Sequence, residues 1–380
     1  MLLIAAIPVA IWAYLLAARG EFWRVSKNLA YPTKHGIQSG KIAVVIPARD
    51  EEAVIGETVR SLLLQNWTAP LQIFLVDDNS TDSTAGVARK TAAELGRSSS
   101  LTVLSGRPLA PGWTGKLWAL SQGVDRALET RPDFLLFTDA DIRHDRENLK
   151  ALVSIAAEKH CDLASFMVKL SCSNFAERSL IPAFVFFFFQ LYPPEWIYSQ
   201  TKPTAGAAGG CVLIRPAALL RIGGLASIRG EVIDDCALAR AVKRKGGRVW
   251  LGLTPTTHST RVYANFGDVG AMIARTAFNQ LQHSSLLLIG TLFGLLFTYV
   301  LPVLLLFSGR TFPALLGGSA YLLMTICYWP MVRFYGLPGY WALTLPAAAT
   351  FYLGATVASA IRYWRGVGGT WKGRAQDVAH

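Results

Sequence analysis

Residues 134–141 read Phe-Leu-Leu-Phe-Thr-Asp-Ala-Asp, an apolar run that ends in two carboxylates one residue apart. The apolar half predicts a buried strand, so the acidic half lies at the carboxyl end of that strand. Two carboxylates in one small space repel each other unless a cation lies between them. Mg²⁺ prefers oxygen ligands and typically uses one or two carboxylates together with substrate phosphates. Asp139 and Asp141 therefore predict a clamp for a metal and a diphosphate, although an Asp-rich surface loop would look the same.

The segments around this strand alternate between strand-like and helix-like patterns. Strands are also predicted at 42–46, where Pro47 is expected to end the strand, at 73–76 and at 101–104. Helices are predicted at about 54–63, after Ser83, from Lys116 and from about Arg146. The first two strands lie about 30 residues apart, as a βαβ unit requires. This alternation predicts an α/β fold with a mostly parallel, Rossmann-like sheet and helices on both faces.

Acidic clusters follow three of the four predicted strands. They are Pro47-Ala-Arg-Asp-Glu-Glu52, Asp77-Asp-Asn-Ser-Thr-Asp82 and Asp139-Ala-Asp141. Ligands of such sheets bind beyond the carboxyl ends of the strands, so the clusters are expected along one edge. Any one cluster could simply cap a helix, because carboxylates are favoured at helix N-termini. Three clusters together favour a function.

The chain contains neither a dinucleotide fingerprint nor a complete P-loop. Residues 112–117 (Gly-Trp-Thr-Gly-Lys-Leu) approach a P-loop, but Ala110 replaces its first Gly and Leu117 its Mg²⁺-binding Ser or Thr. Phosphates must therefore be held mainly by metal and side chains, and Lys116 is a candidate for a phosphate or ribose contact.

The second half of this region offers a small-residue loop and a further acidic pair. Residues 205–210 (Ala-Gly-Ala-Ala-Gly-Gly) allow a ligand or another chain segment to approach closely. Asp234 and Asp235 begin a predicted helix, where carboxylates often serve only as caps. One of them could instead be a general base towards a hydroxyl, worth roughly 10²–10⁴ in rate. His144 and His258 could be further metal ligands, although a solvated or hydrogen-bonded histidine is the simpler interpretation of each.

The composition predicts a membrane protein. Apolar residues make up 52% of the 380 residues, and charged residues only 16%, against about 25% in soluble domains. The apolar excess predicts an uncleaved anchor at 1–18, a soluble domain at 40–280, transmembrane helices within 285–361 and a basic tail at 362–380. The three candidate spans, Ser285–Phe307, Phe312–Met331 and Leu337–Ile361, approach the ~20 residues that cross a bilayer. Ile181–Tyr192 is too short to span, and is either a core helix or an in-plane element, ended by Pro193-Pro194.

The basic residues predict the orientation, but they conflict at the C-terminus. Those that follow the anchor are Arg19, Arg24, Lys27 and Lys34, which place the soluble domain in the cytoplasm. Three crossings would then leave the tail outside, yet the tail carries Arg362, Arg365, Lys372 and Arg374. Either one span is re-entrant or the charge rule fails, and a cytoplasmic tail is favoured. The net charge of +12 suits this placement, and no nucleic-acid partner is expected because no motif for one is present. The five cysteines show neither CxxC nor zinc spacing, so they are expected to be reduced.

Together these motifs resemble the family 2 glycosyltransferases over residues of about 40–255. Residues 42–52 resemble the opening strand and acidic turn of that family, residues 76–82 its nucleotide-binding segment, and Asp139-Ala-Asp141 its metal-binding DxD motif. Gly115-Lys116 with Ala119-Leu120 resembles its Gly-Lys-x-x-Ala-Leu-Asn element, with Ser121 in place of Asn. Asp234-Asp235 resembles its Glu-Asp pair, with Asp in place of Glu.

This resemblance implies a GT-A fold and an inverting transfer from a UDP- or GDP-linked sugar. It implies a nucleotide-sugar site made of Pro47, Asp50, Glu52, Asp77, Asp78, Lys116 and Asp139. It further implies that Asp139 and Asp141 hold Mg²⁺ or Mn²⁺, that Asp235 is the base with Asp234 beside it, and that Gly209 and Gly210 adjoin the acceptor. The Gln-x-x-Arg-Trp motif of processive members is missing, which favours transfer of a single sugar.

The whole layout is most similar to the hopanoid-associated membrane glycosyltransferases. The segments that carry this likeness are Trp113–Trp118, Arg275–Phe278, Arg362–Arg365 and Trp371–Arg374. The likeness implies a lipid acceptor and a multi-pass protein of the bacterial inner membrane, with the catalytic domain facing the cytoplasm.

Two other functions fit parts of the sequence. A polyprenyl-phosphate sugar synthase would use an acceptor phosphate that is already ionised and needs no base. A non-enzymatic membrane binding or transport subunit would be expected to carry charged residues inside its spans. Residues 285–307 and 337–360 contain none, which disfavours transport.

Overall fold

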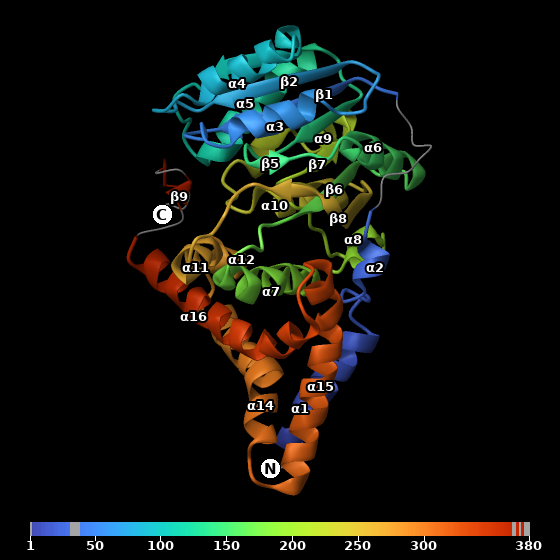
Figure 1. Ribbon diagram of the computed structural model, residues 1–380, viewed down its shortest axis with the longest axis vertical. Coiled ribbons are helices and arrows are strands. Elements are labelled where there is room, and N and C mark those ends of the chain that lie inside the picture. The colour runs from blue at the N-terminus through green and yellow to red at the C-terminus, as the bar shows by residue number, and fades with distance from the viewer. Residues whose placement is uncertain (1, 31–38, 367–369, 372–373, 376–380) are drawn as a thin grey trace.

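The computed structural model describes residues 2–30, 39–366, 370–371 and 374–375, so that Lys34 and Lys372 of the basic segments lie outside the described residues. An eight-stranded sheet forms one end of the molecule and a stalk of apolar helices forms the other (Figure 1). The strands of the large sheet are β1 (Ile42–Ala48), β2 (Leu71–Asp77), β3 (Leu101–Ser105), β4 (Phe134–Phe137), β5 (Ile142–Arg143), β6 (Leu163–Lys169), β7 (Val212–Ile214) and β8 (Val249–Ser259). Two short strands, β9 (Thr370–Trp371) and β10 (Arg374–Ala375), pair near the C-terminus.

The large sheet has a parallel half and a mixed half. Its strand order is β3-β2-β1-β4-β7-β6-β8-β5. Strands β1 to β4 pair in parallel, whereas β7 is antiparallel to both β4 and β6, and β5 is antiparallel to β8. The expected α/β fold class is confirmed, and β7 is the strand at which the parallel order ends.

Strand β1 divides the core between the two faces of the sheet. Ala43 and Val45 pack into one apolar cluster with α5 (Gly115–Glu129), while Ile42, Val44 and Ile46 pack into the other with α3 (Ile55–Leu63). Successive side chains of a strand point to opposite faces, which explains why all seven residues of β1 are buried.

The prediction that Pro47 ends the first strand is wrong. β1 continues through Pro47, which pairs with Val76, and Ala48, which pairs with Asp77. Proline removes one N–H donor, but the ladder continues because Asp78 N donates to Ala48 O at 2.8 Å.

Further helices lie around the sheet or between it and the stalk (Figure 1). They are α2 (Val25–Asn28), α4 (Thr84–Glu94), α6 (Asn148–Glu158), α8 (Pro194–Tyr198), α9 (Pro216–Arg221), α10 (Asp234–Arg244), α11 (Phe266–Ala274) and α12 (Ala277–Gln280), with short 3₁₀ turns η1 (Ser98–Ser100) and η2 (Leu225–Ile228). All five cysteines are free, as expected, and four of them are buried.

The stalk contains the apolar segments predicted to enter a membrane. Its elements are α1 (Leu2–Ala17), α13 (Ser285–Leu295), the π-helical turn η3 (Leu296–Val300), α14 (Leu301–Leu306), α15 (Thr311–Phe334), the 3₁₀ turn η4 (Gly339–Thr344) and α16 (Leu345–Trp364). Among the described residues, four segments are long and apolar enough to cross a membrane, namely 175–198, 285–306, 311–334 and 339–364. Helix α1 is shorter, and it is fixed to the stalk by Trp12, whose Nε1 donates to Thr298 O at 2.8 Å.

Helix α7 (Phe175–Leu191) lies across the stalk, between it and the sheet (Figure 1). The apolar segment predicted here was Ile181–Tyr192, but α7 and α8 together cover Phe175–Tyr198, which is long enough to span a membrane. The prediction that this segment is too short to span is therefore wrong. Its central phenylalanines are core residues: Phe186 and Phe187 contact Tyr328 and Tyr352 at ring-centroid distances of 5.1 and 4.9 Å. The helix therefore joins the half that contains the large sheet to the apolar stalk.

Helix α16 does not run the length of the stalk. The turn that precedes it, η4, lies beside the middle of α15, where the Tyr321 hydroxyl donates to Leu343 O at 2.7 Å. The helix ends beside α11 and α12, where Ser359 Oγ donates to Ala274 O at 2.5 Å. The turn between α14 and α15 lies at the far tip of the stalk, with the N-terminus, whereas α16 ends on the side of the sheet (Figure 1).

Candidate active site

The loops after β1 and β2 are held together by acids predicted to bind a nucleotide. Asp50 Oδ1 accepts a hydrogen bond from Thr81 N at 2.7 Å, and Glu52 Oε2 accepts one from Ser83 N at 2.9 Å. Asp77 accepts one from the backbone of the same loop at 3.1 Å. These three carboxylates thus shape the two loops at the edge where ligands of parallel sheets bind.

Asp78 and Pro47 lie deeper than the other predicted residues. Asp78 is fully buried, and the guanidinium of Arg49 lies 3.9 Å from its carboxylate. Pro47 lines the same small cavity as Lys116 and Asp139. Both residues are therefore at the predicted edge, but on its inner side.

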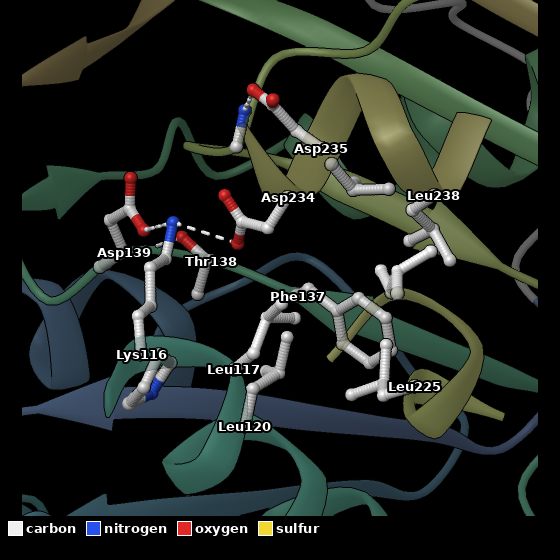
Figure 2. A pocket seen from close by; sticks show the side chains of 14 residues that line it. Lys116, Leu117, Leu120, Phe137, Thr138, Asp139, Leu225, Asp234, Asp235 and Leu238 are labelled. Carbon is white, nitrogen blue, oxygen red and sulfur yellow. Dashed lines mark hydrogen bonds and ion pairs between the residues drawn. The ribbon is translucent and has the colours of Figure 1, made fainter. Parts of the chain in front are cut away.

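Lys116 lies at the centre of the site. It belongs to the first turn of α5, and its Nζ lies 2.9 Å from Asp139 Oδ1 and 3.3 Å from Asp234 Oδ2 (Figure 2). A lysine in the first turn of a helix is disfavoured by the helix dipole, so the two carboxylates supply the negative charge that stabilises it. One ammonium group therefore joins the end of β4 to the start of α10.

The pKa values of this pair reflect mutual stabilisation in a partly buried setting. Burial opposes the charged form of Lys116, but the charges of Asp139 and Asp234 outweigh it and raise the pKa of Lys116 above its usual value. Burial likewise tends to raise the pKa of Asp139, but Lys116 lowers it below its usual value. Both groups are thus charged at neutral pH.

Asp141 has a different basic partner. Arg261, just beyond β8, places its Nε 2.7 Å from Asp141 Oδ2 and its Nη2 3.2 Å from Glu51 Oε1. The backbone of Asp141 is also fixed, because its carbonyl accepts from Thr260 N at 2.7 Å. Each acid of the DxD sequence is therefore neutralised by a separate basic side chain.

The two acids suit a divalent cation in their chemistry. Their carboxylate oxygens are ligands that Mg²⁺ and Mn²⁺ accept. Within the described part of the chain, no three His, Cys, Asp or Glu side chains gather closely enough to hold a metal. Asp139 and Asp141 would therefore supply protein ligands, and substrate phosphates and water the others, which is the usual arrangement for Mg²⁺.

Asp235 points towards the small-residue loop and is not in ion-pair contact with Lys116. Its Oδ2 accepts a hydrogen bond from Gly209 N at 2.7 Å, while Asp234 turns to Lys116 (Figure 2). Burial and the neighbouring charge of Asp234 raise the pKa of Asp235 to about 6. A carboxylate with a raised pKa accepts a proton more readily, which is the property required of a general base.

His144 is a structural residue beneath this site. It is buried, its Nε2 lies 2.9 Å from Thr138 Oγ1, and its Nδ1 lies 3.1 Å from Asn148 Nδ2. Thr138 Oγ1 in turn donates to Gly210 O at 2.8 Å. Burial lowers the pKa of His144 to about 3, so the ring is neutral. The interpretation as a hydrogen-bonded histidine is confirmed, and the chain of contacts joins the end of β4 to Gly210.

One group at this edge was not identified from the sequence. Arg261 meets Glu51, a member of the first acidic cluster, across the site, but no predicted motif contains Arg261 and its partners lie far from it along the chain. Only the antiparallel pairing of β5 with β8 brings Arg261 to Asp141. His258, in contrast, is directed to a separate pocket and not to the DxD acids.

The cavity behind the site is small. It is lined by Lys116, Asp139, Asp234, Asp235, Gly209, Pro47, Thr138 and apolar residues of α5, β4, β7, η2 and α10. Its volume of about 20 Å³ compares with the 10–15 Å³ that a single water needs. A ligand larger than one or two water molecules would therefore lie outside it, over the exposed side of Asp139.

The chain is similar to known glycosyltransferases. The profile described as "Glycosyltransferase like family 2" matches residues 39–268. A 4,4'-diaponeurosporenoate glycosyltransferase of Staphylococcus aureus strain MRSA252 is 36% identical over 115 residues, covering 30% of this chain and only 27% of that protein. Its counterpart from strain bovine RF122 / ET3-1 is 36% identical over 108 residues, covering 28% of this chain and 25% of that protein.

A solved structure shares the fold over nearly the whole length. The mannosyltransferase of Pyrobaculum calidifontis, determined in complex with GDP-Man and Mn²⁺, superimposes with a TM-score of 0.56. The alignment covers 94% of this chain and 99% of that chain at 16% sequence identity. The likeness extends beyond the sheet and includes the apolar half.

Proposed function

This chain belongs to the glycosyltransferase-like family 2, and from that premise we propose that it transfers one sugar, with inversion, from a nucleotide diphosphate sugar to a hydroxyl group of a membrane lipid. Its membership makes it an enzyme, so a purely binding or transport role is not supported. The observation that carries the proposal is the cluster in which Lys116 joins Asp139 to Asp234 while Asp235 faces Gly209.

The donor would lie along the strand ends. Asp139 and Asp141 would hold Mg²⁺ or Mn²⁺, which stabilises the negative charge that develops on the leaving diphosphate. Lys116 would contact the same diphosphate. The remaining nucleotide contacts would come from Pro47, Asp50, Glu52, Asp77 and Asp78. The Mn²⁺ and GDP-Man bound by the mannosyltransferase of the same fold are consistent with this arrangement.

Asp235 would act on the acceptor. Its carboxylate would take the proton of the acceptor hydroxyl, so that the oxygen attacks the anomeric carbon from the side opposite the leaving group. Gly209 and Gly210 carry no side chains, and they leave room for the acceptor beside that carboxylate.

The acceptor is proposed to be a lipid because the catalytic half is built onto apolar helices. The related Staphylococcus aureus enzymes are named for a diaponeurosporenoate, a carotenoid-like lipid. The sequence layout favours a hopanoid-like lipid alcohol at the inner membrane of a bacterium. The proposal includes a membrane anchor at 1–18, a glycosyltransferase domain at 40–280, transmembrane helices at 285–361 and a basic tail at 362–380.

The geometry of α16 supports a topology that removes the conflict between the spans and the basic tail. We propose that α13 to α14 and α15 cross the membrane as a hairpin, with α1 alongside. Residues 335–364 would enter from the cytoplasmic side and return to it, because α16 runs from the middle of α15 back to α11 and α12. Arg362 and Arg365 then lie in the cytoplasm, on the same side as the sheet, as the positive-inside rule requires.

Release of nucleotide diphosphate tests the reaction. Detergent-purified protein would be given UDP- and GDP-sugars, Mn²⁺ or Mg²⁺, and a bacterial lipid extract. Release that depends on one donor and on lipid, and that Asp141→Ala abolishes, is the expected result. Equal release with and without lipid would contradict a lipid acceptor, and equal release by Asp141→Ala would contradict the metal site.

Asp235→Asn separates a hydroxyl acceptor from an ionised one. A hydroxyl must lose a proton, so this variant should lose roughly 10²- to 10⁴-fold in turnover. A polyprenyl phosphate, or a carboxylate such as the diaponeurosporenoate of the related enzymes, is already ionised and needs no base. Nearly full turnover by Asp235→Asn would therefore establish the ionised class of acceptor instead.

A further inference from the structure

A second pocket lies at the junction of the sheet and the apolar helices. Its volume is about 370 Å³, within the range of ligand-binding pockets. It is lined by Lys169, Leu170, Ser171, Cys172, Ser173, His258, Ser259, Thr260, Val262 and Tyr335. We call it the junction pocket. It shares no residue with the cavity beside Lys116 and Asp139.

The junction pocket carries positive charge that no acid neutralises directly. Among the described residues no carboxylate lies within ion-pair distance of Lys169, whose Nζ lies 5.2 and 5.8 Å from the rings of Phe334 and Tyr335. Burial first, and then the charges of Arg143 and Lys169, lower the pKa of His258, so the ring faces Lys169 as a neutral group.

Two acids lie near this pocket, and neither cancels the charge of Lys169. Asp145 raises the pKa of His258, but its effect is smaller than the lowering by Arg143 or by Lys169. Glu177 is fully buried, and its carboxylate accepts hydrogen bonds from Ser171, Ser173 and Tyr263 N. Its charge is therefore already stabilised by these donors, and the ammonium of Lys169 is available to a ligand.

Tyr335 adds a polar group to the same wall. Its side chain is more than nine-tenths buried, and its hydroxyl finds no partner of acceptable geometry within the described chain. The backbone of Leu170 approaches the hydroxyl oxygen, but the hydroxyl hydrogen has no acceptor. A buried unsatisfied donor is costly, and because the hydroxyl is enclosed in the wall, we infer that a ligand acceptor would pair with it once the side chain of Tyr335 turns towards the pocket.

The surroundings of the pocket indicate that the ligand comes from the membrane. Phe175 follows the pocket residue Ser173 closely in the chain, is 67% exposed, and contacts Phe266 and Trp341 at ring-centroid distances of 6.0 and 5.8 Å. Tyr340, 65% exposed, stacks on Trp341. An exposed Tyr stacked on a half-buried Trp at the end of an apolar helix is typical of a membrane–water interface.

We propose that the junction pocket binds the phosphate of an anionic membrane lipid. Lys169 is the charge partner of that phosphate, His258 and Tyr335 supply further donors, and the exposed aromatic residues beside the pocket contact the acyl chains. Such a lipid would hold the linker between β6 and α7 against the end of α15, and so fix the catalytic half to the membrane surface. The proposed lipid takes no part in the sugar transfer, although Thr260 in the wall of the pocket donates to the carbonyl of Asp141 at 2.7 Å.

The test measures lipid binding without turnover. Full-length protein in a neutral detergent would be titrated with phosphatidylglycerol, and the shift in melting temperature would be followed. Lys169→Gln should weaken the apparent affinity for this lipid by about tenfold or more, as expected for loss of a charge-assisted hydrogen bond. Lys159→Gln is the matched control, because Lys159 also lies over a tyrosine ring, that of Tyr198, outside the pocket.

Tyr335→Phe provides a second variant if Lys169→Gln is poorly folded. It removes the unsatisfied hydroxyl, so it should leave the lipid-free melting temperature unchanged or higher while reducing the shift caused by phosphatidylglycerol. An equal lipid response in the wild type, Lys169→Gln and Tyr335→Phe would overturn the site. So would an equal loss of response in Lys159→Gln. A full response to inorganic phosphate, or to phosphatidylcholine, would overturn the anionic lipid as the source.

Discussion

Replacing Arg261 should reveal the competition between this cation and a metal. Arg261 contacts Asp141 at 2.7 Å and Glu51 at 3.2 Å, so a divalent ion that binds Asp141 must displace the guanidinium or be repelled by it. We therefore expect Arg261→Gln to bind Mn²⁺ more tightly than the wild type when no nucleotide is present. In the presence of metal, the same variant should bind the nucleotide diphosphate more weakly, because the displaced guanidinium would contact the phosphates.

The size of the effect follows from the exposure of the ion pair. The side chains of Asp141 and Glu51 are only 11% and 12% exposed, whereas that of Arg261 is 40% exposed. A fully exposed pair would be worth about 0–1 kcal/mol, and a hydrogen bond to a charged group about 1.5–3 kcal/mol. An intermediate value of about 1–2 kcal/mol corresponds to roughly a 5- to 30-fold change in Mn²⁺ affinity.

Electron paramagnetic resonance of free Mn²⁺ measures this affinity directly in the detergent-purified protein. Arg143→Gln is the matched control, since Arg143 lies on β5 next to the site but pairs with Glu57 at 3.7 Å, away from Asp141. Its Mn²⁺ affinity should equal that of the wild type. If Arg261→Gln bound Mn²⁺ no more tightly than the wild type in the absence of nucleotide, Arg261 would not compete with the metal for Asp141, and the reasoning would be refuted.

Two further predictions concern pH dependence and packing. Asp234 raises the pKa of Asp235, which must be ionised to accept a proton, so kcat/KM should rise through about pH 6. Asp234→Asn should move this rise of kcat/KM to lower pH. A rise that stays at the same pH or moves to higher pH would contradict the role of Asp235 as the base. Gly123→Ala places a methyl group against Val45 and 2.9 Å from Val76, and should reduce the free energy of unfolding by about 1–3 kcal/mol. Gly86→Ala, with open space around it, should not lower the melting temperature.

The sequence was sufficient wherever a local pattern determined the structure. The run Phe134–Phe137 forms β4 with the predicted ends, because an apolar strand buried on both faces is followed at once by polar residues. The first turns of α5 and α10 begin within one residue of the predicted positions. Pro47 was the exception, since a local rule on proline did not account for the ladder that continues beyond it.

The parts of the site that depend on distant pairing could not be predicted. Arg261 meets Asp141 across 120 positions of the chain, and that contact exists only because β5 pairs with β8. Hydrophobicity gave the length of the last apolar segment but not its path, which is determined by packing of α16 against α11 and α12. In both cases the missing information is the order of elements in space.

Lys116 shows how a local conflict marks the functional site. A basic residue in the first turn of α5 opposes the helix dipole, at a cost of about 0.3–1 kcal/mol. The carboxylates of Asp139 and Asp234 offset that cost. Without a cation nearby, however, Asp139 would be repelled by Asp141, and Asp234 by Asp235. Each of these residues is unfavourable alone and is stabilised only by the others. Natural sequences accept such local conflicts mainly where the charges serve a ligand, and we propose that an incoming metal and diphosphate would take over from Lys116 and Arg261 as the partners of Asp139 and Asp141.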